Sequence, residues 1–150
     1  MKIFTNYDKL ENDIFDVCHM FYEDEQNDEK PFIHHTFSKY KNIVKNEYRI
    51  EAENEEYSFS EEKEIKNCSD ELEEKRKIKR AAKLTLYKML SNHFSKNMPW
   101  GSLTGIRPTK IGYDLLNSGI DICMINDALE ENFLVSKEKA KLVQNVIRNQ

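Results

Sequence analysis

The sequence has few of the residues that interrupt regular structure. Its 150 residues include only 4 Gly and 3 Pro. So little glycine and proline argues against a flexible linker, a low-complexity tail and a loop-rich all-β fold. The composition therefore favours long helices.

Cysteine is equally scarce, and the three thiols are far apart in the sequence. Cys18, Cys68 and Cys123 form no CxxC pair, and the four histidines form no HxxxH pair. A disulfide framework and a zinc finger are both disfavoured by this spacing. We expect no metal site in this chain.

The motifs that usually announce catalysis are also missing. The sequence contains no GxGxxG, GxxxxGK[ST], GxSxG or HExxH string, so it predicts no catalytic residue. No apolar run approaches the roughly 18 residues of a membrane span, and the first residues lack the layout of a signal peptide. We therefore expect a cytoplasmic protein with no membrane partner.

Charge is abundant and unevenly distributed. Residues 1–70 hold 18 acidic and 9 basic residues, whereas residues 71–150 hold 9 acidic and 14 basic residues. The change falls within residues 67–74. It indicates either two subdomains that attract each other or one basic face offered to a partner.

The periodicity of apolar residues predicts an α+β fold. A small antiparallel sheet with one helix occupies the N-terminal half, and the C-terminal half is all helical. We expect an acidic βαβββ-like subdomain over residues 1–68 and a basic helical subdomain over residues 69–150. The predicted strands are 2–6, 32–37, 47–52 and 56–60, and the predicted helices are 10–22, 69–94, 108–117, 121–129 and 136–150.

The long helix that begins near Ser69 and Asp70 has an unusual polar face. Seven basic residues follow one another there without an intervening acid. Such a face is either simply solvated or a docking surface for nucleic acid, an acidic domain or an anionic substrate. Its residues are Lys75, Arg76, Lys77, Lys79, Arg80, Lys83 and Lys88.

Residues 99–110 concentrate rare residue types. They hold the only tryptophan, two of the four glycines and two of the three prolines. If Pro108 is the first helical residue, the helix start lacks a side-chain cap and can receive a carboxylate or phosphate. The alternative is structural: Trp100 and Ile106 fill the core and Arg107 pairs with an acidic neighbour. The candidates for anion or substrate binding are Trp100, Thr104, Gly105, Arg107, Thr109 and Lys110.

The string WGSLTGIRPTK, residues 100–110, resembles a block in the N-terminal region of a family of Firmicutes-type radical SAM proteins. These are oxygen-independent coproporphyrinogen III oxidases, or coproporphyrinogen dehydrogenases, that carry an extra N-terminal domain. The resemblance implies an accessory domain in haem and porphyrin biosynthesis that helps to position the substrate or the catalytic barrel. The alternative is a non-catalytic nucleic-acid-binding or dimerisation module, although the acidic composition makes nucleic acid an improbable partner.

The resemblance also implies cofactors and partners for the parent enzyme. Its oxidoreductase chemistry, the oxidative decarboxylation of two propionates of coproporphyrinogen III, uses S-adenosylmethionine and a [4Fe-4S] iron-sulfur cluster held by a CxxxCxxC motif. The three cysteines here do not match that motif, so we expect neither cofactor in this chain. The implied partners are a radical SAM barrel of the same polypeptide, expected after residue 150, and the anionic porphyrinogen.

Overall fold

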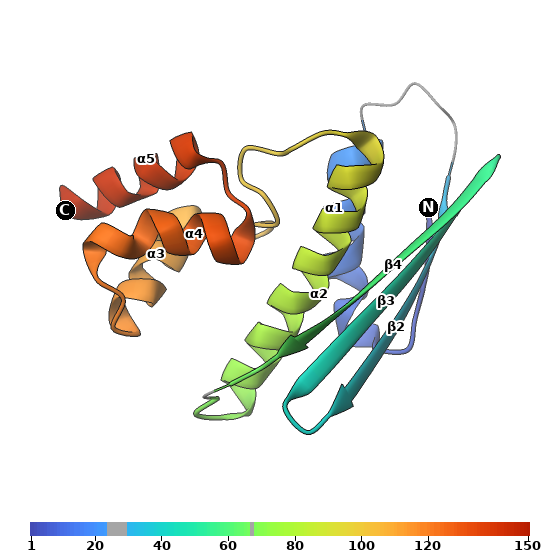
Figure 1. Cartoon of the computed structure of the whole chain (residues 1–150), viewed down its shortest axis with the longest axis horizontal. Helices are drawn as coiled ribbons and strands as arrows, with labels where there is room; N and C mark the ends of the chain where they lie inside the picture. The colour runs from blue at the N-terminus through green and yellow to red at the C-terminus, as the bar shows by residue number, and fades with distance from the viewer. Residues whose placement is uncertain (24–29, 67) are drawn as a thin grey trace. The chain divides into compact units, whose positions relative to one another are not determined.

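The computed structural model describes residues 1–23, 30–66 and 68–150 (Figure 1). The chain forms two compact units, Met1–Ser95 and Lys96–Gln150. The first unit contains the whole sheet and two long helices, and the second is helical. The α+β class predicted from the sequence is confirmed.

Four strands form one sheet in the order β1-β2-β3-β4. The strands β2, β3 and β4 pair antiparallel, as predicted, but β1 pairs parallel to β2. A helix carries the chain from β1 back to the starting end of β2, and such a crossover makes neighbouring strands parallel. The sheet is therefore mixed rather than purely antiparallel. The strands are β1 Lys2–Thr5, β2 Phe32–Tyr40, β3 Ile43–Ala52 and β4 Glu55–Glu64.

Two helices, α1 Glu11–Tyr22 and α2 Glu71–Phe94, lie on the same side of this sheet (Figure 1). A short 3-10 turn, η1 Asp8–Leu10, precedes α1. Alternate strand residues such as Ile33, Tyr48 and Ile50 are buried on the helix side. Burial of alternate residues is the pattern of a sheet with one dry face.

The helix α2 starts where the sequence predicted. Asp70 is the N-cap, and its Oδ1 accepts a hydrogen bond from the Glu73 amide at 2.8 Å. In return Glu73 Oε2 accepts from the amide and the hydroxyl of Ser69, at 2.9 and 2.5 Å. The bond to Asp70 satisfies an amide donor that a helix start otherwise leaves open, and the bonds from Ser69 hold the Glu73 carboxylate in place. They also lower the pKa of Glu73 to about 2, mainly through the Ser69 hydroxyl.

The compact units divide after Ser95, not at the expected boundary between residues 68 and 69. Contacts of α2 explain the difference, because this helix packs against α1, β3 and β4. Tyr48 of β3 donates a hydrogen bond from its hydroxyl to the Ala82 carbonyl of α2 at 2.8 Å. The change in charge along the sequence thus falls inside one packed unit.

The second unit contains the helices that the sequence predicts between residue 108 and the end of the chain. A cluster of buried apolar side chains, including Ile111, Leu129, Phe133 and Ile147, joins them. The helix predicted over residues 121–129 is a 3-10 turn followed by a longer α-helix. The elements are α3 Pro108–Asn117, η2 Ile122–Met124, α4 Ile125–Phe133 and α5 Lys137–Arg148. Within the described residues, no helix combines the length and apolar composition needed to cross a membrane.

A buried histidine links three strands of the first unit. In its neutral form, His35 Nε2 donates to Asn46 Oδ1 at 2.8 Å and Nδ1 accepts from the Thr5 hydroxyl at 2.8 Å. The ring stacks on Tyr48 with a centroid distance of 4.6 Å. Burial lowers the pKa of His35, and the hydrogen bond to Asn46 opposes part of that shift.

The lowered pKa predicts that acid destabilises the first unit. The unfolded chain binds a proton at His35 near pH 6.5, whereas the folded chain resists it. The stabilising contribution of His35 is therefore complete above about pH 6.5 and declines as the pH falls below that value. Urea unfolding between pH 5 and 8 should show this slope, and His35→Gln should flatten it. An unchanged slope in the His35→Gln variant would contradict the assignment.

Candidate functional site

The first half of the motif loop is fixed to the core of the second unit. Gly101 has a φ of +57°, and a Cβ built on it would lie 2.2 Å from the Phe133 carbonyl oxygen. Ser102 is buried, and both its amide and its hydroxyl donate to that same carbonyl, at 2.8 and 3.1 Å. Only glycine fits at position 101, because a side chain would displace the end of α4.

Trp100 belongs to the same fixed segment. Its ring is partly buried against the apolar cluster of the second unit, and Lys139 Nζ lies 5.5 Å above the ring centroid. The neighbouring Pro99 carbonyl accepts from the Ser136 amide at 2.9 Å. The structure thus places Trp100, an anion-binding candidate, in a packing role.

The second half of the loop is exposed to solvent. Gly105 has a φ of +70° with no atom within 4 Å of an added Cβ, and Arg107 is exposed. Ile106 is 44% exposed, so it does not fill the core as the structural alternative supposed. Arg107 makes no ion pair with any residue that the structure describes, which also differs from that alternative.

The start of α3 matches the expected geometry in part. Pro108 is the first helical residue, and the N-cap Arg107 provides no side-chain hydrogen bond. The Lys110 amide, however, donates to the Arg107 carbonyl at 3.0 Å and is not available to a ligand. Arg107, Thr109 and Lys110 lie within one turn at the start of α3, and Thr104 and Gly105 precede them in the loop. Anion binding at this turn stays a prediction.

The basic face of α2 is largely paired inside the first unit. Lys79 and Lys83 lie 3.7 and 3.4 Å from the two oxygens of Asp13 on α1. Lys88 lies 2.7 Å from Glu61 on β4, and Lys77 pairs with Glu73 at 3.5 Å. These contacts leave Lys75 and Arg76 as exposed cations of the predicted docking face, with Arg80 half-buried. Most of the basic run therefore binds acidic neighbours of the same unit.

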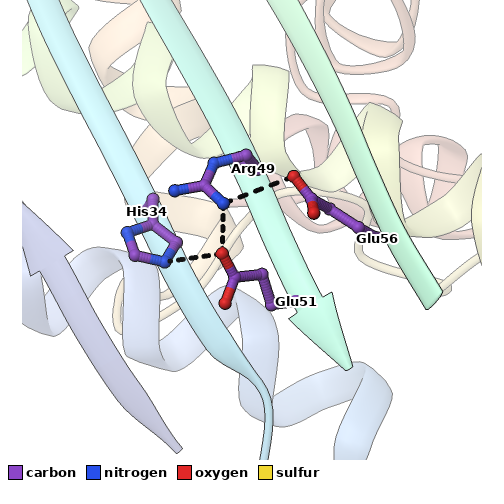
Figure 2. Close-up of polar contacts among 4 residues, drawn as sticks. All are labelled: His34, Arg49, Glu51 and Glu56. Atoms are coloured by element: carbon purple, nitrogen blue, oxygen red, sulfur yellow. Dashed lines mark hydrogen bonds and ion pairs between the residues drawn. The ribbon is translucent and has the colours of Figure 1, made fainter. Parts of the chain in front are cut away.

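A polar hollow that the sequence did not predict lies on the side of the sheet opposite the helices. It is open, has a volume of about 580 Å³ and is lined by residues of β2, β3 and β4. Figure 2 shows the polar contacts at its margin, which join His34, Arg49, Glu51 and Glu56. Arg49 Nη1 contacts Glu51 and lies 3.3 Å from Glu56, while His34 Nε2 lies 3.5 Å from Glu51. The two carboxylates raise the pKa of Arg49.

The sequence contained part of the signal for this hollow. Lys45, Glu47, Arg49 and Glu51 alternate along β3, which marks one wet face. Their cross-strand partners depend on the register, which pairs Arg49 with both His34 and Ser58. That register becomes visible only in the folded sheet.

The three cysteines lie in different environments and do not suit an iron-sulfur cluster. Cys18 is buried in the first unit, Cys68 is half-buried and Cys123 is exposed in the second unit. Burial raises the pKa of the Cys18 thiol, which disfavours the thiolate that a cluster requires. In the part of the chain that the structure describes, no three His, Cys, Asp or Glu side chains are grouped to hold a metal ion.

Comparison with known proteins gives one informative similarity. Over 75 residues, half of this chain, the sequence is 31% identical to the oxygen-independent coproporphyrinogen-III oxidase-like protein HemZ of Bacillus subtilis (strain 168). The matched segment covers 15% of that protein, so the likeness concerns a small part of a much longer polypeptide. No protein-family model matches the chain. No solved structure matches it either.

The two glycines of the motif loop should differ in their tolerance of alanine. Gly101→Ala combines a positive φ with overlap of the Phe133 carbonyl, and we expect it to destabilise the second unit by about 2–4 kcal/mol. Gly105→Ala meets only the backbone strain, about 1 kcal/mol. Urea unfolding followed by the fluorescence of Trp100, the single tryptophan, reports on this unit. Equal losses would show that the Gly101 contact is easily relieved.

Proposed function

We propose that this chain is an accessory part of an oxygen-independent coproporphyrinogen-III oxidase-like protein and contributes to porphyrin biosynthesis without catalysing the reaction itself. The observation that carries the proposal is the 31% identity to HemZ over half of the chain. The motif of residues 100–110 supports it, because this string resembles a block in the N-terminal region of the same kind of protein. The oxidoreductase chemistry, the [4Fe-4S] cluster and S-adenosylmethionine then belong to another part of the parent protein.

The role proposed for the motif loop is to hold a carboxylate of an anionic porphyrinogen. Arg107 and Lys110 are exposed cations separated by less than one helical turn, at the positive end of the α3 dipole. The N-cap residue Arg107 forms no side-chain hydrogen bond to an amide of the first turn of α3. A carboxylate bound there gains a charge-assisted hydrogen bond, and Arg107 offers a planar fork that matches two carboxylate oxygens.

The fixed half of the loop supports the exposed half. Gly101, Ser102 and Trp100 pack against the core of the second unit, so that the exposed residues Gly105 to Lys110 follow a segment held by backbone and side-chain contacts. Preorganised cations bind an anion with less loss of conformational entropy than mobile ones. In this proposal, the first residues of the motif serve packing and the later, exposed residues serve ligand binding.

A direct binding measurement tests this role. Coproporphyrin III, a tetracarboxylate, should quench the fluorescence of Trp100, and Arg107→Ala should weaken its binding about tenfold, which corresponds to about 1.4 kcal/mol. Arg107→Lys should recover part of the loss because it keeps the charge without the planar fork. Lys141→Ala, which removes an exposed cation from α5 of the same unit, serves as the matched control and should change little.

The same substitutions separate a binding role from a structural one. In the parent protein, Arg107→Ala should raise KM for coproporphyrinogen by about the same factor, while the melting temperature of this chain stays unchanged. If Arg107→Ala lowers the melting temperature by several degrees and leaves binding and KM unaltered, Arg107 is a structural residue. The motif would then act as scaffold, and the accessory role would have to lie on another surface.

A further inference from the structure

The open face of the sheet carries exposed aromatic side chains as well as the polar hollow. Phe4 and Phe32 are 50% and 42% exposed, and their rings lie stacked with a centroid distance of 6.5 Å. Phe4 also stacks on His34 at 5.2 Å. Solvent-exposed stacked rings are costly to leave uncovered, and exposed apolar patches commonly mark interaction sites. In the described residues of the first unit, both α1 and α2 lie on the other side of the sheet (Figure 1).

The charge of this face decides which partner suits it. Strand register and alternation place five carboxylates on the open face, against three cations. The carboxylates are those of Glu47, Glu51, Glu56, Glu62 and Glu64, and the cations are Lys2, Lys45 and Arg49.

This excess of negative charge disfavours two otherwise plausible occupants. A second copy of the chain, stacked face to face, would bring like charges together. A nucleic acid or another polyanion needs a positive surface, although the exposed rings would suit stacking of bases. A basic protein segment can form ion pairs with the carboxylates and stack its cations on the aromatic rings.

We propose that the open face of the sheet is a docking surface for an arginine-bearing segment of a protein partner. A guanidinium stacks on aromatic rings and forms bidentate bonds with carboxylates, so Phe4, Phe32, Glu51 and Glu56 together offer what it requires. Arg49 already occupies the space between Glu51 and Glu56 (Figure 2). It shows that this pair of carboxylates accepts a guanidinium, and it competes with an incoming one. This proposal does not depend on the function proposed above.

A labelled peptide tests the surface with matched variants. The probe is a fluorescein-labelled decapeptide of alternating arginine and glycine, and its binding to the 150-residue chain is followed by fluorescence anisotropy. Phe4→Ala should weaken binding about threefold or more. Phe15→Ala is the control, because Phe15 is 44% exposed on α1 and stacks on His19 at 5.4 Å in the same way.

Charge variants distinguish a specific surface from general attraction. The double substitution Glu51→Gln and Glu56→Gln should weaken binding about fivefold or more, whereas Glu11→Gln with Asp16→Asn removes the same charge from α1 and should have little effect. Arg49→Gln should strengthen binding, because it releases both carboxylates. An anionic occupant predicts the opposite sign for Arg49→Gln.

Several outcomes would overturn the proposal. Equal effects of the face variants and their α1 controls would show non-specific attraction between opposite charges. Weaker binding of the peptide by Arg49→Gln would contradict a basic occupant. Binding of a ten-nucleotide single-stranded oligothymidine that depends on Phe4 would identify a nucleic-acid surface. Dimerisation in sedimentation equilibrium that Phe4→Ala abolishes would identify a second copy as the occupant.

Discussion

The contact between Tyr48 and α2 determines which side of the sheet is dry. The Tyr48 ring is buried, and its hydroxyl donates to the Ala82 carbonyl in the middle of the longest helix. A buried phenol needs such a partner, since an unsatisfied hydroxyl in the core costs free energy of about 1–3 kcal/mol. The bond fixes α2 over β3, and α1 packs beside it on the same face. The charged residues Lys45, Glu47, Arg49 and Glu51, which alternate with the buried residues of β3, consequently lie on the opposite face.

The buried histidine depends on the same arrangement. His35 stacks on Tyr48 and bridges Thr5 of β1 and Asn46 of β3. A polar group is tolerated in this core because both ring nitrogens have partners. The parallel strand β1 is thereby joined to the antiparallel part of the sheet by side chains as well as by backbone hydrogen bonds. Protonation of His35 would make Nδ1 a donor, so the Thr5 hydroxyl would no longer donate to it, whereas Nε2 would keep its bond to Asn46.

Local signals in the sequence predicted the elements well. The cap at Asp70 and the proline at position 108 placed the starts of α2 and α3, because both act within a single helical turn. The direction of β1 could not be predicted in the same way, because it depends on where the crossover helix returns the chain. The two compact units divide after Ser95, because the change of charge near residue 70 reports composition, whereas the division into units reports packing.

The same distinction between local features and features that depend on the fold applies to the candidate site. The sequence marks residues 99–110 as rich in glycine, but only the fold distinguishes Gly101, which lies against Phe133, from Gly105, which lies in open solvent. The group formed by His34, Arg49, Glu51 and Glu56 was not predicted, because its members are brought together by strand register across residues 34–56. Sequence reasoning finds features that lie within a turn or two of each other. Sites assembled across strands require the register.

The ion pairs of α2 explain why its run of seven basic residues does not form an equally extensive basic surface in the folded unit. Asp13, from the acidic half, pairs with Lys79 and Lys83 of α2, and Glu61, also from the acidic half, pairs with Lys88. The cations of α2 therefore neutralise acidic groups within their own unit. The excess acidic residues that remain include those on the open face of the sheet, where neighbouring cations are outnumbered. The open face of the sheet therefore combines carboxylates with exposed aromatic rings, whereas the basic run of α2 that composition singled out is largely paired.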